Sequence, residues 1–362
     1  MTDATLRDDL IRLTSELIAI PSIDSEPAQL QAVIDYAEQY ARAVPGVFVQ
    51  RAERDGKPSL IATLRDTQAP ALMLNAHLDV VPARPEQFVA ELRDGRIYGR
   101  ASQDMKGSGA VLLRLLRDLA ALPAPPDVGF MFVSDEEIGG EHGTGYLAEI
   151  GWGCKFFIAA EPTDMQICYS QKGAIWIEAL LPGRPAHGSR PWEGANAIAA
   201  LRDGLVALEQ RFPTPDEAAW LTTVVPTVVQ GGSAGNRLPE DVRLTFDVRH
   251  VPEDEPEQIL AAVQACFEGE VRMLRGGPPL TTDPNDAYVQ RLAASLTAVT
   301  GRPAQFYREH FASDARFYSQ RQIPAVCFGP VGAGLHSDEE WVEVDSLVEL
   351  YDVLRHFALE NT

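Results

Sequence analysis

Four apolar runs in this chain are each followed, at or just beyond their end, by a histidine or an acidic residue. In chain order they are 71–74 with His77, 128–133 with Glu136 and Glu137, 156–160 with Glu161, and 323–328 with His336. Short, continuous apolar runs are typical of strands that are buried on both faces. The carboxyl ends of such strands lie along one edge of an open α/β sheet, so we expect these polar side chains to lie together.

Helical and extended patterns alternate between these runs. Apolar residues at helical spacing predict helices, which cover about 5–20, 27–43 and 110–122. Residues 60–64 and 71–74 are interpreted as two neighbouring strands. Asp104 lies in a loop just ahead of the third helix. An aspartate at a helix start is also common without any metal, because helix N-termini attract negative charge.

The pattern changes between about 173 and 282. Strand and helix patterns then follow in the order β-α-β-β-α-β, over about 174–181, 195–211, 222–230, 242–248, 256–267 and a short strand near 271. This is the order of a ferredoxin-like α+β sandwich. The sequence therefore predicts a discontinuous, mixed-sheet α/β domain of residues 1–172 and 283–362, with a second domain inserted at 173–282.

Charge and composition exclude several classes of function. The chain of 362 residues has a formal net charge of −21, with 45% hydrophobic and 23% charged residues. Nucleic acids and anionic membranes require basic faces, so neither is expected as a partner. The sequence shows no apolar run long enough for a membrane span and no signal peptide, so we expect a cytoplasmic protein. The four cysteines are too far apart for a thiolate metal site or a C-x-x-C redox pair.

Five residues at or near the strand ends are candidate metal ligands, namely His77, Asp104, Glu137, Glu161 and His336. Imidazole and carboxylate donors without a thiolate suit Zn²⁺, Mn²⁺ or Co²⁺, and five are more than one tetrahedral ion needs. Two ions that share one carboxylate would use all five, and such a pair polarises a carbonyl group and activates a shared water. Glu136 would lie beside a ligand, where a general base can accept the proton of that water.

These motifs, in this order, resemble the M20 metallopeptidase and deacylase family over essentially the whole chain. That family includes acetylornithine deacetylase, succinyl-diaminopimelate desuccinylase, aminoacylases and dipeptidases. The segments that carry the resemblance are His77–Pro82, Tyr98–Gly107, Ser134–Glu137, Glu161–Thr163, Ala186–Pro191 and His336–Glu340. The resemblance implies an αβα catalytic domain of the zinc-exopeptidase type, and it makes the inserted segment a lid and dimerisation domain in a homodimer.

The resemblance also implies how the five ligands are divided between two divalent ions, most simply zinc, with cobalt and manganese as alternatives. Asp104 would bridge the ions, and a cis peptide bond would follow it. His77 and Glu161 would complete one site. Glu137 and His336 would complete the other.

Further roles follow from the same resemblance. Glu136 would be the general base, and Asp79 would orient the first histidine ligand. His187, in the inserted segment, would reach the site of the other subunit and stabilise the carbonyl oxyanion. Arg249 and Asn236 match positions that bind substrate, and Arg249 suits an α-carboxylate because a guanidinium offers paired donors.

We therefore expect a dinuclear-metal amidohydrolase that deacylates a small N-acyl amino acid. The alternative within the family is a dipeptidase or aminopeptidase, which would need a site for a free α-amine. A non-catalytic binder on the same fold should have lost a ligand or the base, and all six positions are present. A metal-free enzyme with a serine nucleophile is the weakest alternative.

Overall fold

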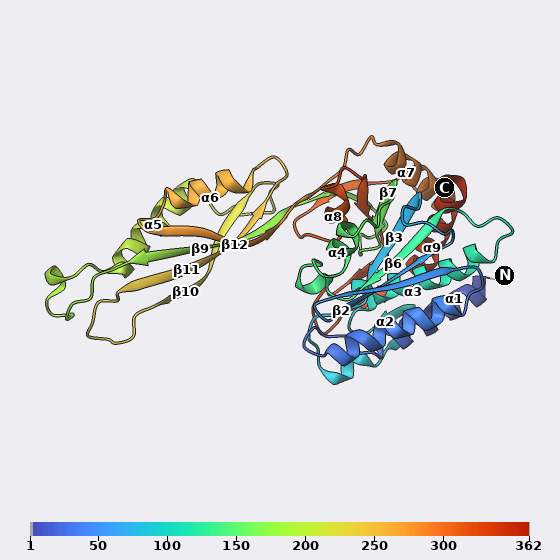
Figure 1. The fold of residues 1–362 in the computed structure, drawn as a ribbon, viewed down its shortest axis with the longest axis horizontal. Helices are drawn as coiled ribbons and strands as arrows, with labels where there is room; N and C mark the ends of the chain where they lie inside the picture. Colours follow the sequence, from blue (N-terminus) through green and yellow to red (C-terminus); the bar gives the residue numbers. More distant parts are fainter. Residues whose placement is uncertain (1–2, 362) are drawn as a thin grey trace. The chain divides into compact units, whose positions relative to one another are not determined.

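The computed structural model describes residues 3–361 of the chain, which form two compact units. Of the described residues, the larger unit comprises 3–170, 280–308 and 313–361. The smaller unit comprises Gln171–Pro279 and Glu309–Ala312. Figure 1 shows each unit as its own set of strands and helices. The roles of metal-binding domain and of lid and dimerisation domain stay predictions for these two parts of the chain.

A mixed sheet of nine strands forms the centre of the larger unit. Its order is β1 (Phe48–Arg54), β2 (Lys57–Thr63), β6 (Val128–Val133), β3 (Leu72–His77), β7 (Phe156–Ala159), β15 (Ala325–Cys327), β8 (Ile167–Gln171) and β13 (Leu280–Thr281), with β14 (Phe306–Glu309) paired to β8. The four strands that precede the candidate residues are parallel neighbours, in the order β6, β3, β7, β15. Their carboxyl ends therefore meet at one edge of the sheet, as the apolar runs predict.

One predicted strand pairing is wrong. The strands at 60–64 and 71–74 are not neighbours, because β6 lies between β2 and β3. β6 runs antiparallel to β2, with Leu60 opposite Phe132, and parallel to β3, with Leu74 opposite Phe130. β6 is buried along its whole length, and a strand that is apolar on both faces is most stable inside a sheet. The prediction assumed that β2 and β3 pair because they are consecutive in the sequence.

Helices cover both faces of this sheet. The helices α1 (Asp3–Ile18), α2 (Pro27–Arg42), α3 (Gly107–Ala120), α7 (Ala287–Thr300) and α9 (Val344–Asn361) share one apolar core with one face. The short helices α4 (Thr144–Glu149) and α8 (Ala315–Ser319) pack in a second core on the other face. Successive side chains of β3 enter different cores, Leu72 and Leu74 the first and Met73 the second. This alternation is the period of two of a strand, and it produces the expected αβα layers.

A small antiparallel sheet also belongs to the larger unit. Its order is β16 (Gly332–Ala333), β17 (Trp341–Glu343), β5 (Arg96–Tyr98) and β4 (Glu91–Arg93). It joins the segment before Asp104 to the segment after His336, since Trp341 pairs with Tyr98. Two candidate ligands that are far apart in sequence are thereby brought to one place.

The smaller unit has the predicted ferredoxin-like topology. Its elements follow as β9 (Gly173–Pro182), α5 (Ala197–Arg211), β10 (Thr223–Gly231), β11 (Asp241–His250), α6 (Pro256–Gln264) and β12 (Glu270–Gly277). They form an antiparallel sheet in the order β10-β11-β9-β12. Figure 1 shows α5 and α6 on the same side of this sheet, where they enclose one apolar core.

The smaller unit also contains a sequence pattern that concerns the alternative of a metal-free enzyme with a serine nucleophile. Residues 231–235 have the pattern Gly-x-Ser-x-Gly. They follow β10 and lead into β11, which is antiparallel to β10, rather than into a helix. A nucleophile elbow requires a turn from a strand to a helix, so this pattern does not make a serine hydrolase.

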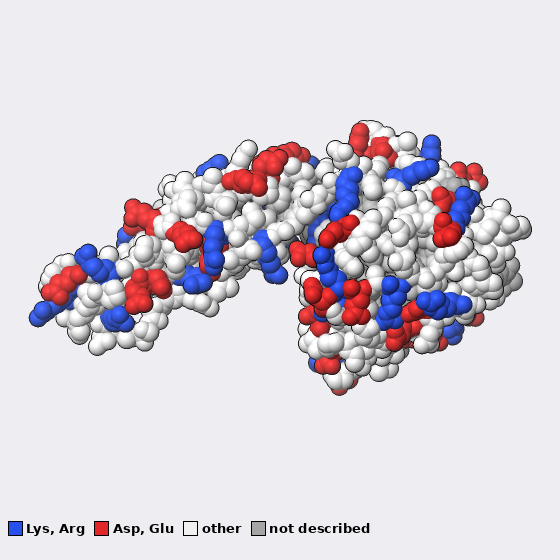
Figure 2. Space-filling model, viewed as in Figure 1, with Lys and Arg blue, Asp and Glu red and all other residues white. Residues whose placement is uncertain are grey.

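No helix among residues 3–361 is long and apolar enough to cross a membrane. On the face drawn in Figure 2, Lys and Arg side chains are interspersed with Asp and Glu side chains over each unit. That face therefore offers no broad basic surface.

A buried arginine ties together three helices of the larger unit. The side chain of Arg114 in α3 is fully buried, and its guanidinium donates to Asp9 of α1 and, at 2.8 Å, to Asp118 of its own helix. The hydroxyl of Tyr351 in α9 donates to the same Asp118 carboxylate at 2.6 Å. The buried positive charge of Arg114 therefore contributes to the packing of α1, α3 and α9.

We predict that Arg114→Met lowers the free energy of unfolding by about 3 kcal/mol, because it removes the buried cation that Asp9 and Asp118 share. Both carboxylates then still contact Arg117, but its side chain is 38% exposed. Urea unfolding followed by circular dichroism measures the loss. The control is Arg302→Met, since Arg302 is 58% exposed in its pair with Glu349 and its loss should lower the free energy of unfolding by less than about 1 kcal/mol. Equal effects of the two variants would contradict the prediction.

Candidate metal centre

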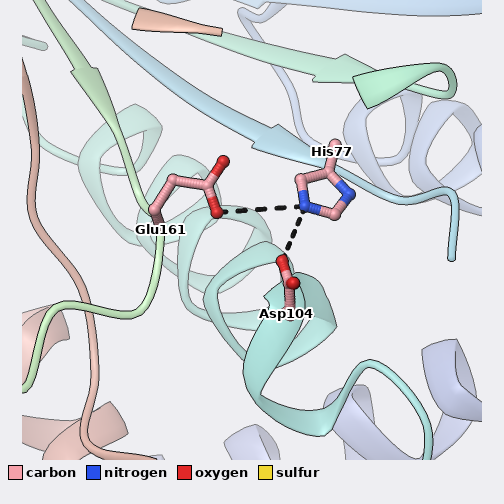
Figure 3. A group of neighbouring side chains, drawn as sticks. All are labelled: His77, Asp104 and Glu161. Atoms are coloured by element: carbon pink, nitrogen blue, oxygen red, sulfur yellow. Dashed lines mark hydrogen bonds and ion pairs between the residues drawn. The ribbon is translucent and has the colours of Figure 1, made fainter. Parts of the chain in front are cut away.

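The first group of possible ligands lies where β3 and β7 end. His77 is the last residue of β3, and Glu161 follows β7 by two positions. The Nε2 atom of His77 lies 2.9 Å from Oδ1 of Asp104 and 3.9 Å from Oε2 of Glu161. Figure 3 shows both dashed lines ending on the same ring nitrogen of His77. The three side chains thus converge on one point from three segments of the chain.

The second group shares one residue with the first. The Nε2 atom of His336 lies 3.3 Å from Oδ2 of Asp104 and 3.3 Å from Oε2 of Glu137. Asp104 therefore presents one carboxylate oxygen to each group. All five residues that the sequence nominated as ligands belong to these two groups.

The spacing of these atoms fits divalent cations. Two ligand atoms bound at about 2.0–2.1 Å to one tetrahedral zinc ion are about 3.3 Å apart. The separations between partners in the two groups are 2.9, 3.9, 3.3 and 3.3 Å. Each group supplies one imidazole and two carboxylates, which is a suitable donor set for a catalytic zinc ion with an open position. The residues present therefore fit two ions that share Asp104.

Crowding of acids at this edge shifts several pKa values. Burial is the largest cause that raises the pKa of Glu161 and of Glu137 above the usual range. Hydrogen bonds to Asp104 and Glu137 raise the pKa of His336 to about 10. Burial also opposes the charge on Asp104, but hydrogen bonds to His336 and His77 outweigh it and lower the pKa of Asp104. The raised pKa values mean that Glu161, Glu137 and His336 hold their protons more strongly than usual. Divalent cations can replace these protons, since metal binding and deprotonation are coupled.

Asp79 joins the end of β3 to the acidic turn after β6. Its Oδ1 and Oδ2 atoms accept hydrogen bonds from the backbone N–H groups of Glu136 and Glu137, at 3.2 and 3.0 Å. Its carboxylate also lies 3.6 Å from Nδ1 of His77, and this ring nitrogen is 3.1 Å from the backbone oxygen of Asp79. Asp79 thus contacts both the histidine that it was predicted to orient and the turn that carries the predicted base.

Glu136 lies in this turn, Glu136–Ile138, and its carboxylate belongs to neither ligand group. Burial, followed by the charge of Glu161, raises the pKa of Glu136 well above its usual value. Glu136 is therefore a half-buried acid that adjoins the candidate ligand Glu137 and belongs to neither group, which is the position the sequence predicts for a proton carrier.

Two of the candidate ligands, Asp104 and His336, lie at unusual backbone conformations. Asp104 lies in one distorted helical turn, Ser102–Lys106, and its peptide bond to Met105 is cis, as the resemblance implies. Ala101, just before this turn, has a φ of 64°, and His336 has a φ of 59°. A positive φ is uncommon for residues other than glycine, and such strained conformations cluster at functional sites.

The remaining predicted residues lie in the smaller unit. Nδ1 of His187 is 2.8 Å from the hydroxyl of Ser189, and the backbone oxygen of Asn236 accepts a hydrogen bond from Gly188 at 2.7 Å. His187 and Asn236 therefore lie on adjoining loops. Arg249 is held by both oxygens of Asp247, at 2.8 and 3.1 Å. The substrate-binding roles of these residues stay predictions.

A second layer of polar residues behind the acidic turn was missed from the sequence. The hydroxyl of Thr144 donates to Asp314 at 2.6 Å and lies 3.2 Å from Nδ2 of Asn75. Asp135 accepts the backbone N–H of His142 at 2.7 Å. Of these residues, only Asp135 could be noticed in the sequence, because it is one of three consecutive acids after an apolar run. Asp314 precedes a helix of five residues and stands in no motif.

Comparisons with known proteins agree with this geometry. The model of Peptidase family M20/M25/M40 matches residues 73–360. Succinyl-diaminopimelate desuccinylase 2 from Shewanella loihica is 29% identical over 374 residues, which cover 95% of this chain and 98% of that protein.

Solved structures share the fold. Aminopeptidase PepT from Bacillus cereus superposes with a TM-score of 0.80 at 19% identity, over 97% of this chain and 98% of that one. An M20 family metallo-carboxypeptidase from Sulfolobus solfataricus does so with a TM-score of 0.78 at 19% identity, over 96% and 98% of the two chains. These likenesses extend over both units.

The polar layer behind the acidic turn generates a prediction on pH and stability. Burial raises the pKa of Asp314 to about 6 from its ordinary value of 3.8. Between these two values the unfolded chain has lost the proton that the folded protein keeps. The folded state then binds more protons, so the contribution of Asp314 to the free energy of unfolding falls as the pH rises. The groups that act on it are Thr144, Arg316, His77, Asp79 and Asp135.

We expect Asp314→Asn to remove this titration. Relative to the wild type, the free energy of unfolding of the variant should rise between about pH 4 and pH 6, by on the order of 3 kcal/mol, and then level off. Urea unfolding of chelator-treated protein across this range measures the difference. A difference that does not change with pH would show that Asp314 titrates normally.

Proposed function

The chain belongs to peptidase family M20/M25/M40 and is a metal-dependent hydrolase of amide bonds, and we propose that it deacylates an N-acyl amino acid. The observation that carries the proposal is the position of Asp104, whose two oxygens face two separate ligand groups. A curated relative that matches over 95% of this chain is named a desuccinylase, which favours an acyl amino acid over a peptide as substrate. We place the reaction in the cytoplasm.

Five residues would hold the two ions, with His77 and Glu161 on one side of Asp104 and Glu137 and His336 on the other. Zinc suits this mixed nitrogen and oxygen set, and cobalt or manganese would be accepted by the same donors. When bound, the ions would supply Lewis acidity to the amide carbonyl group and lower the pKa of a water molecule.

Glu136 is the proposed general base. It would accept a proton from the attacking water and deliver it to the nitrogen that leaves when the C–N bond breaks, so that the products are a carboxylate and a free amine. The backbone N–H groups of Glu136 and Glu137 donate to Asp79, and these two hydrogen bonds fix the backbone of the turn that contains Glu136. Burial keeps its carboxyl group away from bulk water, which favours proton transfer to the substrate over exchange with solvent.

The smaller unit is proposed to bind the substrate. Arg249 would hold the α-carboxylate with donors that Asp247 leaves available, because a guanidinium has five N–H groups. Asn236 would bind the same substrate. His187 would stabilise the carbonyl oxyanion in the site of a second subunit, which makes a homodimer the proposed functional form. A dipeptidase or aminopeptidase of the same family is the alternative.

The test is release of a free amine from a panel of substrates by protein reconstituted with Zn²⁺ or Co²⁺. The panel contains N-succinyl-diaminopimelate, N-acetylornithine, other N-acetyl amino acids and simple dipeptides. We expect release from at least one acyl amino acid, and a chelator should abolish it. Release from dipeptides alone would establish the alternative, and no release by protein that holds two ions would contradict both.

Within the same assay, Glu136→Ala should lower kcat at least about 100-fold, the contribution expected of a general base. Its metal content, measured by elemental analysis, should equal that of the wild type, because Glu136 is not a ligand. The control is Glu141→Ala, which removes an exposed acid from the same loop and should leave kcat unchanged. A Glu136→Ala enzyme with wild-type turnover would show that another group carries the proton.

A further inference from the structure

Glu340 is a buried acid that the proposed mechanism does not use. It is 2% exposed, and it lies four residues beyond His336, in the last of the segments that carry the family resemblance. Its Oε1 atom accepts hydrogen bonds from the backbone N–H groups of Gln103 and Asp104, at 3.1 and 3.2 Å. Its Oε2 atom accepts the N–H of Ala101 at 2.9 Å and a guanidinium N–H of Arg100 at 2.6 Å.

All four donors come from one stretch of five residues, 100–104, which ends in the shared carboxylate Asp104. A buried carboxylate is stable only when each oxygen is satisfied, and here each oxygen receives two donors. No other side chain of this length offers two acceptor oxygens, because an amide would turn an NH₂ group toward a backbone N–H. The arrangement is therefore specific to glutamate.

Glu340 also ties this stretch to the segment of the second histidine. Its backbone oxygen accepts the N–H of Gly99 at 3.1 Å, and the next residue, Trp341, pairs with Tyr98 between β17 and β5. The backbone and side chain of this one residue thus bind five of the six positions 99–104, including the left-handed Ala101. Through Glu340, the segment after His336 is therefore hydrogen-bonded to the turn that carries Asp104.

From this geometry we propose that Glu340 is a positioning residue for both metal ions, because it fixes the turn that aims the two oxygens of Asp104 at the two ligand groups. The inference rests on the proposed function in one respect, namely that the two groups bind metal. Since both groups use Asp104, a displaced turn weakens both ions together. Loss of a ligand that serves one group weakens one ion.

The alternative is that Glu340 and Arg100 form an ordinary buried ion pair that stabilises the fold. In that case, a substitution of Glu340 would lower the free energy of unfolding and leave the affinity for metal intact. Asp118 of the same unit, fourteen positions beyond Asp104, offers a matched comparison. Its carboxylate accepts hydrogen bonds from the buried guanidinium of Arg114 and from the Tyr351 hydroxyl. Asp118→Asn breaks a buried ionic network without touching either ligand group.

The experiment is a calorimetric titration of metal-free protein with Co²⁺, together with the visible absorption spectrum of the bound Co²⁺. The wild type should bind two ions. In Glu340→Gln both binding steps should weaken by tenfold or more, the usual effect of removing a group that orients a metal ligand, and the spectrum should change. In His336→Ala only one step should weaken. In Asp118→Asn stability should fall while both affinities stay at the wild-type values.

Circular dichroism and urea unfolding without metal establish that each variant is folded. Glu340→Asp is the second variant, since it keeps the charge and both acceptor oxygens but withdraws them by one methylene, and it should weaken both steps in the same way. Two ions bound as tightly as in the wild type, or one weakened step alone, would overturn the positioning role. A wild type that does not bind two ions would instead refute the proposed metal centre.

Discussion

Every buried carboxylate at the active edge of the larger unit has to find donors or cations, and this constraint organises the site. Asp79 takes two backbone N–H groups of the acidic turn, and Glu340 takes three backbone N–H groups and a guanidinium. These two acids are satisfied by the protein itself. Asp104, Glu137 and Glu161 are left with imidazoles and with one another. The fold thereby separates carboxylates that bind backbone N–H groups from the carboxylates that form the two candidate ligand groups.

Sequence reasoning succeeded where hydrophobic pattern decides the structure. Continuous apolar runs identified β3, β6, β7 and β15, and burial of such strands in parallel order brings their ends together. Four of the five candidate ligands converge for that reason, and Asp104 reaches them from the turn Ser102–Lys106 ahead of α3. The six elements of the smaller unit were likewise predictable, because each has a distinct period and the β-α-β-β-α-β order permits few arrangements.

The features that sequence reasoning missed depend on contacts between distant segments. The insertion of β6 between β2 and β3 follows from packing of whole strands rather than from local pattern. Asp314 behaves as part of the site only because helix α8 brings it to Thr144. Glu340 was visible in a motif, but its partners lie about 240 residues earlier in the chain. A local pattern can nominate an acid, but it cannot say which backbone groups that acid will meet.

The proposal that two ions lie on either side of Asp104 can be tested by anomalous diffraction from crystals grown with Zn²⁺. We expect two anomalous peaks about 3.5–4 Å apart, the spacing of two-metal sites. One peak should lie among His77, Asp104 and Glu161, and the other among Asp104, Glu137 and His336. A single peak, or two peaks that do not share Asp104, would contradict it.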